Sequence, residues 1–391
     1  MTGRERIRAA MAHQPCDRTP VMCQLALGHY LLNTDVPPAE LWFSSEGFAR
    51  ALVELARRYR FDGILINLPG RPVNWREQMD RIERLPDGTE MVYWPNGEIT
   101  RCPPDDNPQH LAPERSRPAL EDVNPEWLYY DDPHVPCGLK YPFSFEPEIP
   151  SGPPSREWPP YLFRTIELVR EATGGELSVH SEVFSPFTQF LELFGYQNAL
   201  IYLLEEPDRC HAILRAYAAG AGDLAAAQAR HGVDAVLISS AFAGAGFISR
   251  EQYREFVLPY EGEVIRRAKE GGAPFVYTHT CGAIGDRLDL MVETGTDGID
   301  TLDPPPLGTV DLAEAKERYG DRVFFKGNID SVNTLLKGDA ETVRKDAEMR
   351  VRIGSRGSGY ILSSACSVAP RVPPENLLVL VEVAEAAGPV R

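Results

Sequence analysis

The chain has 391 residues, of which 43% are hydrophobic and 25% are charged, a composition typical of an ordinary globular protein. Its formal net charge of −17 excludes a protein that binds nucleic acid through clustered basic residues. There is no apolar run of about 18 residues, and the charged amino terminus lacks the apolar core of a signal peptide. We therefore expect a cytoplasmic protein that does not span a membrane.

The cysteines are odd in number and scattered along the chain. They are Cys16, Cys23, Cys102, Cys137, Cys210, Cys281 and Cys366. Without an export signal, this pattern indicates reduced thiols rather than a framework of disulfides.

Short apolar or β-branched segments recur along the chain and alternate with amphipathic helical segments, such as 259–271, 309–319 and 373–388. The eight predicted strands are 20–25, 61–67, 177–183, 234–242, 274–281, 297–304, 323–330 and 359–367. Nearly continuous apolar runs are typical of parallel strands covered on both faces. Eight such units predict an α/β fold, a single (β/α)8 TIM barrel over residues 1–391. A doubly wound open sheet is the alternative, but no G-x-G-x-x-G follows the first strand.

An insertion of about 80 residues, near 80–160, separates the second predicted strand from the third. Asp87-Gly88 and Asn96-Gly97 favour the turns of β-hairpins. The following segment, 103–160, is rich in proline and acidic residues. We interpret the whole as an insertion over the barrel mouth, either a lid or a surface decoration unrelated to the site.

The strongest chemical signal is the segment Val276-Tyr-Thr-His-Thr-Cys-Gly-Ala at the end of the fifth predicted strand. Side chains two residues apart in a strand share a face, so His279 and Cys281 point together. Cys366 ends the eighth predicted strand, and barrel enzymes build their sites at these carboxyl ends. One imidazole and two thiolates leave a fourth position of tetrahedral zinc open, and thiolates favour zinc over magnesium. The sequence therefore predicts a zinc site.

Two other interpretations of the same residues remain open. A cysteine near a strand end is commonly a small buried core residue. Cys281 is alternatively a nucleophile activated by His279, although that leaves Cys366 without a role.

Several segments spread over nearly the whole chain resemble the uroporphyrinogen decarboxylase superfamily, and most closely its zinc-dependent, corrinoid-linked methyltransferases. The segments are Arg4-Glu-Arg-Ile-Arg-Ala-Ala-Met, Asp17-Arg-Thr-Pro-Val, Ser185-Pro-Phe-Thr, Ile248-Ser-Arg-Glu-Gln-Tyr, Phe256-Val-Leu-Pro-Tyr, His279-Thr-Cys-Gly, Gly327-Asn-Ile-Asp and Pro373-Pro-Glu-Asn-Leu. The resemblance implies a (β/α)8 barrel, and a zinc ion held by a His-x-Cys pair and a later cysteine. These match His279, Cys281 and Cys366.

The resemblance also implies an activity. It indicates a methyltransferase that moves a methyl group between a small substrate, either a methoxy or methylamine compound or a thiol, and a cobalamin carried by a partner corrinoid protein. Zinc either holds a thiol substrate as its thiolate or acts as a Lewis acid on a methylated substrate. The resemblance further implies a homodimer.

One departure from the family bears on the reaction. The superfamily's decarboxylases resemble one another in an Arg-Gln-Ala-Gly-Arg-Tyr segment that meets an acidic porphyrinogen, whereas this chain has Gln24-Leu-Ala-Leu-Gly-His-Tyr. A substrate with many carboxylates needs cationic partners. The absence of these arginines argues against decarboxylation, so a decarboxylase of porphyrin biosynthesis is only the alternative function. A non-catalytic zinc- or corrinoid-binding protein is another alternative.

Further residues at strand ends are candidates for the chemistry. The catalytic candidates are Glu182, Asn328 and Asp330. Glu182 is a fourth metal ligand, a proton donor or a salt-bridged carboxylate. Asn328 and Asp330 share one phase of their strand, so we expect them to orient a ligand or a metal-bound histidine.

The substrate-binding candidates are His180, Tyr277 and Arg71. His180 alternates in phase with Glu182, and Tyr277 precedes His279 by two positions. Arg71 follows the second strand and either meets a substrate carboxylate or is a solvated surface residue. Asp300 and Asp303 end the sixth strand out of phase, so we expect at most one of them to face inward.

Overall fold

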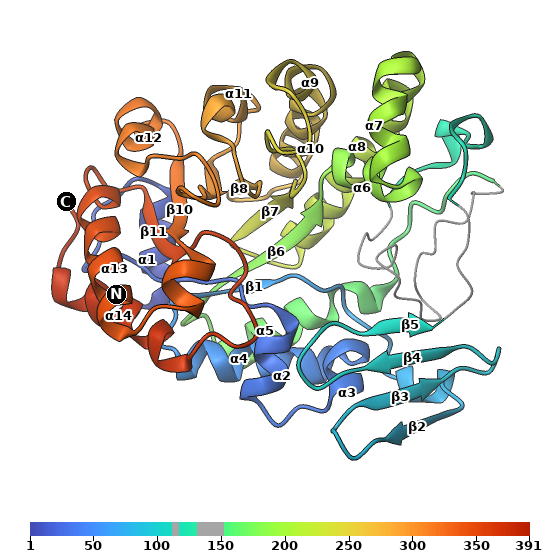
Figure 1. Cartoon of the computed structure of the whole chain (residues 1–391), viewed down its shortest axis with the longest axis horizontal. Helices are drawn as coiled ribbons and strands as arrows, with labels where there is room; N and C mark the ends of the chain where they lie inside the picture. Colours follow the sequence, from blue (N-terminus) through green and yellow to red (C-terminus); the bar gives the residue numbers. More distant parts are fainter. Residues whose placement is uncertain (112–116, 131–151) are drawn as a thin grey trace.

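The computed structural model describes residues 1–111, 117–130 and 152–391 (Figure 1). Seven parallel strands form one curved sheet in the order β1-β6-β7-β8-β9-β10-β11. Their bounds are β1 Gly63–Ile66, β6 Ser178–Phe184, β7 Ala235–Ser239, β8 Val276–His279, β9 Gly298–Thr301, β10 Phe324–Ile329 and β11 Tyr360–Ser364. Six of the seven lie within a predicted strand, and β6 extends one residue beyond the predicted strand 177–183.

The first predicted strand, 20–25, is reduced to isolated parallel bridges that close the sheet. Val21 pairs with Leu362 and Leu25 with Val368, which attaches this segment to β11. On its other side, Asp62 N donates to Val21 O at 2.8 Å just before β1 begins. The segment thus spans the gap between β11 and β1, and the fold is the predicted TIM-barrel type.

Helices surround the sheet (Figure 1). They are α1 Gly3–Met11, α2 Leu27–Asn33, α3 Pro38–Phe43, α4 Ser45–Arg58, α5 Arg164–Thr173, α6 Pro186–Phe194, α7 Tyr196–Glu205, α8 Pro207–Arg230, α9 Arg250–Phe256, α10 Leu258–Glu270, α11 Leu288–Glu293, α12 Leu312–Tyr319, α13 Ala340–Gly354 and α14 Pro374–Ala387. The helix predicted over 309–319 begins later because the Asp311 side chain accepts hydrogen bonds from the backbone of its first turn. Within the described residues, no helix has the length and apolarity needed to cross a membrane.

The predicted hairpins form an antiparallel four-stranded sheet beside the barrel. Its strands are β2 Arg81–Arg84, β3 Glu90–Tyr93, β4 Ile99–Cys102 and β5 Gln109–Leu111. Ala39 N donates to Glu90 Oε2 at 2.8 Å, which ties this sheet to α3. Of the proline-rich segment 103–160, residues 112–116 and 131–151 lie outside the described residues, and its placement over the barrel mouth stays a prediction.

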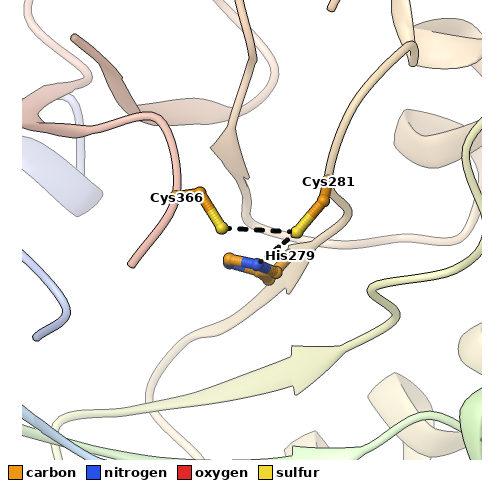
Figure 2. A group of neighbouring side chains, drawn as sticks. All are labelled: His279, Cys281 and Cys366. Atoms are coloured by element: carbon orange, nitrogen blue, oxygen red, sulfur yellow. Dashed lines mark hydrogen bonds between the residues drawn. The ribbon is translucent and has the colours of Figure 1, made fainter. Parts of the chain in front are cut away.

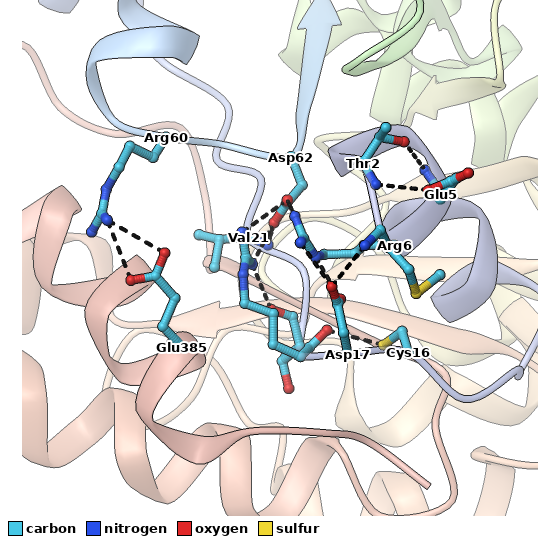
Figure 3. A network of polar contacts seen from close by, with 12 residues as sticks. Thr2, Glu5, Arg6, Cys16, Asp17, Val21, Arg60, Asp62 and Glu385 are labelled. Atoms are coloured by element: carbon cyan, nitrogen blue, oxygen red, sulfur yellow. Dashed lines mark hydrogen bonds and ion pairs between the residues drawn. The ribbon is translucent and has the colours of Figure 1, made fainter.

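A buried carboxylate holds the amino-terminal end of the barrel together (Figure 3). Asp62 accepts from Arg18 Nη1 at 2.7 Å, from Arg18 Nη2 at 2.9 Å, from Arg6 Nη1 at 3.1 Å and from Val21 N at 2.8 Å. Since Arg6 belongs to α1 and Val21 to the first bridge, one side chain joins the helix, the bridging segment and β1.

Apolar side chains fill the barrel interior next to this end, and polar side chains lie nearer the carboxyl ends of the strands. The apolar layer consists of Ile7, Ala10, Met11, Met22, Leu65, Ala235, Leu237, Tyr277, Phe324 and Ile361. Beyond it, His279, Asp300 and Lys326 lie side by side on β8, β9 and β10 in register. Polar groups therefore collect at the carboxyl ends of the strands, where barrel enzymes place their sites.

Candidate metal centre

Two strand ends bring an imidazole and two sulfur atoms together (Figure 2). His279 Nε2 lies 3.3 Å from Cys281 Sγ, and Cys281 Sγ lies 3.5 Å from Cys366 Sγ. The ligand atoms of these three residues all lie within 4.8 Å of one another, and no other such group occurs among the described residues. The three atoms converge on one point, as the ligands of a single small cation do.

The ring of His279 is oriented by a residue from the next strand. Asp300 Oδ2 lies 2.9 Å from His279 Nδ1, and Asp300 Oδ1 accepts from Lys326 Nζ at 2.9 Å. A carboxylate on Nδ1 places the proton there and leaves Nε2 as the ligand nitrogen. The structure thus assigns to Asp300 the contact with His279 that the sequence suggested for Asn328 or Asp330. Lys326 was not among the predicted residues.

Charge on these groups follows from the same contacts. Burial disfavours ionisation of Asp300, but Lys326 and His279 outweigh it and hold its pKa at about 2. Burial likewise opposes the charged imidazolium, but Asp300 and the Cys366 sulfur raise the pKa of His279 to about 10. The hydrogen bond from Cys281 lowers the pKa of Cys366, and the same bond together with burial raises the pKa of Cys281. The lowered pKa favours the thiolate form of Cys366.

The chain after β9 breaks the expected alternation of side chains. Thr301 and Leu302 have φ values of 76° and 58°, a left-handed conformation that a β-branched residue rarely adopts. The turn directs both acids to the site: Asp300 contacts His279, and Asp303 Oδ2 accepts from Gly282 N at 2.6 Å. The prediction that at most one of them faces inward is therefore wrong, because it assumed an extended backbone between them.

Two hydrogen bonds hold this turn in place. Thr301 Oγ1 donates to Thr280 O at 2.6 Å, and Asn328 Nδ2 donates to Leu302 O at 2.9 Å. Asn328 thus contacts the turn beside the ligands, and its predicted catalytic role stays a prediction.

Asp330 supports the loop that carries Cys366. Its carboxylate accepts from Val332 N at 2.8 Å and from Asn333 N at 2.7 Å, which caps the helical segment Ser331–Leu336. Ser331 Oγ in turn accepts from Cys366 N at 3.0 Å. These contacts of Asp330 are those of a capping residue, and a direct part in catalysis remains a prediction.

His180 and Tyr277 are partners within the barrel. His180 Nδ1 lies 2.9 Å from the Tyr277 hydroxyl, and both side chains are fully buried. Burial lowers the pKa of His180 to about 4, which keeps its ring neutral at pH 7. The structure does not place either residue in the three-ligand group, and substrate binding by them stays a prediction.

Glu182 and Arg71 lie apart from the group formed by His279, Cys281 and Cys366. Both line a cavity at the carboxyl ends of β1 and β6. Arg71 is only 3% exposed, so it is not the solvated surface residue that the sequence left open. Its Nε donates to Trp42 O at 3.1 Å.

The fold and the site define a TIM-barrel protein with a His-Cys-Cys group at the carboxyl ends of its strands. A family model described as uroporphyrinogen decarboxylase (URO-D) matches residues 147–387. The chain belongs to this family, whose members are enzymes such as decarboxylases and methyltransferases.

The relatives of this chain include both decarboxylases and methyltransferases. A uroporphyrinogen decarboxylase of Alkalilimnicola ehrlichii is 24% identical over 98% of this chain and 94% of its own length. A methylcobamide:CoM methyltransferase of Methanosarcina barkeri is 26% identical over 57% of this chain and 62% of its own. Among solved structures, a methyltransferase from Methanosarcina mazei superposes with a TM-score of 0.69 at 17% identity, covering 99% of each chain, which shows the shared fold.

Proposed function

We propose that this protein is a zinc-dependent methyltransferase that moves a methyl group between a small substrate and a cobalamin carried by a partner corrinoid protein. The observation that carries the proposal is the convergence of His279 Nε2 with the sulfur atoms of Cys281 and Cys366, within 4.8 Å of one another. Two thiolates and an imidazole suit zinc and leave one position for a substrate atom.

The residues around the three ligands fit this assignment. Asp300 holds a proton on His279 Nδ1, so Nε2 is the nitrogen that would give up its proton to a metal, and Lys326 keeps Asp300 charged inside the barrel. Cys366, with its lowered pKa, needs no further base to become a ligand. When bound, zinc would supply Lewis acidity that polarises a heteroatom of the small substrate.

The corrinoid part of the proposal is supported by similarity. The methyltransferase of Methanosarcina barkeri takes its methyl group from a methylcobamide according to its name, and it is similar to this chain over 57% of the chain. The solved methyltransferase from Methanosarcina mazei shares the fold over the whole chain.

Decarboxylation of a porphyrinogen is the second candidate, because several relatives of this chain are named uroporphyrinogen decarboxylases. The structure offers little to bind such a substrate at the segment where the family's decarboxylases place arginines. In this chain His29 occupies that segment, fully buried, with its ring against the Tyr59 hydroxyl at 2.8 Å and Pro370 O at 3.2 Å. Burial lowers the pKa of His29, so its ring is neutral and unsuited to a polycarboxylate.

The proposal is tested by metal analysis followed by methyl exchange. We expect about one zinc ion per chain, and strong loss of zinc in Cys281→Ser and Cys366→Ser without unfolding. Cob(I)alamin and methylcobalamin absorb differently, so mixing the protein with cobalamin and a panel of methoxy compounds, methylamines and thiols reports transfer. Exchange that survives complete zinc removal, or formation of coproporphyrinogen from uroporphyrinogen, would overturn the proposal.

A further inference from the structure

A cavity of about 80 Å³ lies between the carboxyl ends of β1 and β6 and the helices α5 and α8. Four aromatic side chains contribute to its wall: Tyr130, Trp158, Tyr161 and Phe184. An apolar cavity of about 150 Å³ admits a benzene molecule, so this one has room for a few heavy atoms and none for a tetrapyrrole ring. It therefore suits one end of a small organic molecule.

Polar groups without internal partners face this aromatic cavity. Thr165 Oγ1 and Asn67 Oδ1 both line it, and neither has a hydrogen-bond partner among the described residues. The Thr165 side chain is only 1% exposed. A buried hydroxyl without a partner costs free energy of about 1–3 kcal/mol, which a ligand that bonds to it would recover.

One wall of the cavity carries a cation. Arg71 lines it and is 3% exposed, with Nε donating to Trp42 O at 3.1 Å and the guanidinium 5.6 Å from the centre of the Trp42 ring. These contacts hold the planar group in one orientation. A fixed guanidinium and a hydroxyl donor in the lining of the same cavity suit the two oxygens of a carboxylate.

The opposite wall leads towards the three metal ligands. Glu182 and Phe184 line the cavity from β6, and Phe184 pairs with Ser239, which pairs with His279. Two strand spacings separate Phe184 from His279, about 10 Å. A molecule of modest length that is anchored in the cavity would direct its far end to the metal centre.

We propose that this cavity binds the carboxylate end of a small organic substrate through Arg71 and Thr165, with the reacting end directed past Glu182 to His279, Cys281 and Cys366. The inference rests on the proposed function and names its substrate class: a small methylated carboxylate. The charged end belongs with Arg71, and the uncharged end with Glu182, because a second carboxylate beside Glu182 would be repelled.

The test compares three molecules that share a methoxy group on a short chain and differ in charge: methoxyacetate, 2-methoxyethanol and 2-methoxyethylamine. Dissociation constants are measured on the full chain by tryptophan fluorescence, with Trp158 in the cavity wall, and by the shift in thermal unfolding. No corrinoid is added, so the result does not depend on methyl transfer. We expect methoxyacetate to bind at least about ten-fold more tightly than the other two, from the charge-assisted hydrogen bonds.

Two variants locate the binding. Thr165→Val keeps the shape and removes the hydroxyl, so it should weaken methoxyacetate roughly ten-fold while leaving thermal unfolding of the free protein unchanged or raised. Thr19→Val is the matched control, because Thr19 Oγ1 is also buried and without a partner among the described residues but does not line this cavity. Arg71→Gln should remove the preference for the carboxylate.

Equal affinity for the three molecules, or unchanged affinity in Thr165→Val, would overturn the cavity assignment. Zinc-dependent exchange with cobalamin that proceeds despite this result would leave the proposed function standing. Conversely, selective binding of methoxyacetate in a protein that exchanges no methyl group with cobalamin would support the cavity and overturn the proposed function.

Discussion

Asp300 is the carboxylate on which both the orientation of His279 and the charge balance of Lys326 depend. Its two oxygens lie 2.9 Å from His279 Nδ1 and 2.9 Å from Lys326 Nζ. All three residues are at most 5% exposed, so water does not replace either contact. Loss of the carboxylate partner of a metal-bound histidine weakens metal binding by roughly 10- to 100-fold. We expect Asp300→Asn to lower zinc affinity by that factor.

The same substitution also affects folding, because it leaves the Lys326 ammonium buried without its counterion. Removing one partner of a buried ion pair costs about 3–5 kcal/mol of unfolding free energy. In the double variant Asp300→Asn with Lys326→Met, both charges are gone, and most of this loss should be recovered. Zinc affinity should stay low in the double variant, since the histidine still lacks its carboxylate.

Zinc affinity is measured by competition with a chromophoric chelator, and stability by urea unfolding of the metal-free protein. Asp321→Asn, at an exposed aspartate, is the matched control and should change neither quantity. Wild-type zinc affinity in Asp300→Asn would show that the carboxylate does not orient the ligand. Recovery of affinity in the double variant would show that the single change acted through stability alone.

Three further predictions concern the barrel and its surroundings. Burial raises the pKa of Glu261 from 4.5 to about 7. Between these pH values the folded protein holds a proton that the unfolded chain has lost, so the free energy of unfolding falls by on the order of 3 kcal/mol as the pH rises from 4.5 to 7. Glu261→Gln should flatten this dependence in urea titrations from pH 4.5 to 7. Asp62→Asn should lower the free energy of unfolding by about 3–5 kcal/mol, because it leaves buried arginine charge unpaired. Asp17→Asn, at a side chain that is 41% exposed, should lower it by less in the same urea assay. Tyr277→Phe should lower the free energy of unfolding by about 1–3 kcal/mol, because it removes the hydroxyl that bonds to His180 Nδ1, and zinc content should not change. A selective rise in KM without this loss of stability would instead support the predicted role of Tyr277 in substrate binding.

The strands were predictable because most are short, nearly continuous runs of apolar residues, as parallel strands covered on both faces require. The first predicted strand, 20–25, is the exception, because only isolated bridges form there, at Val21 and Leu25. The proximity of the three candidate metal ligands was predictable for a related reason, while their binding of a metal stays a prediction. His279 and Cys281 are two residues apart at one strand end, and Cys366 lies at the corresponding end of another, so strand period and barrel geometry suffice to bring them together.

Side chains whose roles depend on a neighbouring element were harder to predict. A lysine in the buried strand Phe324–Ile329 was a signal, because a charge there needs a partner, but the sequence does not identify Asp300 as that partner. Arg71 is similar. It is buried where the Trp42 ring, from an earlier helix, lies by its guanidinium and the Trp42 carbonyl accepts a hydrogen bond from its Nε.

The wrong prediction at Asp300 and Asp303 shows where strand phase stops being informative. Alternation holds only while the backbone is extended, and Thr301 and Leu302 leave that region with φ values of 76° and 58°. Such a conformation costs free energy and persists only when surrounding contacts enforce it. Here the contacts come from the strands on either side: Thr280, after β8, accepts from Thr301 Oγ1, and Asn328, on β10, donates to Leu302 O. The part of the site that the sequence did not predict is therefore the part that two neighbouring strands impose on a third, and it is this turn that brings a second acid to the backbone beside Cys281.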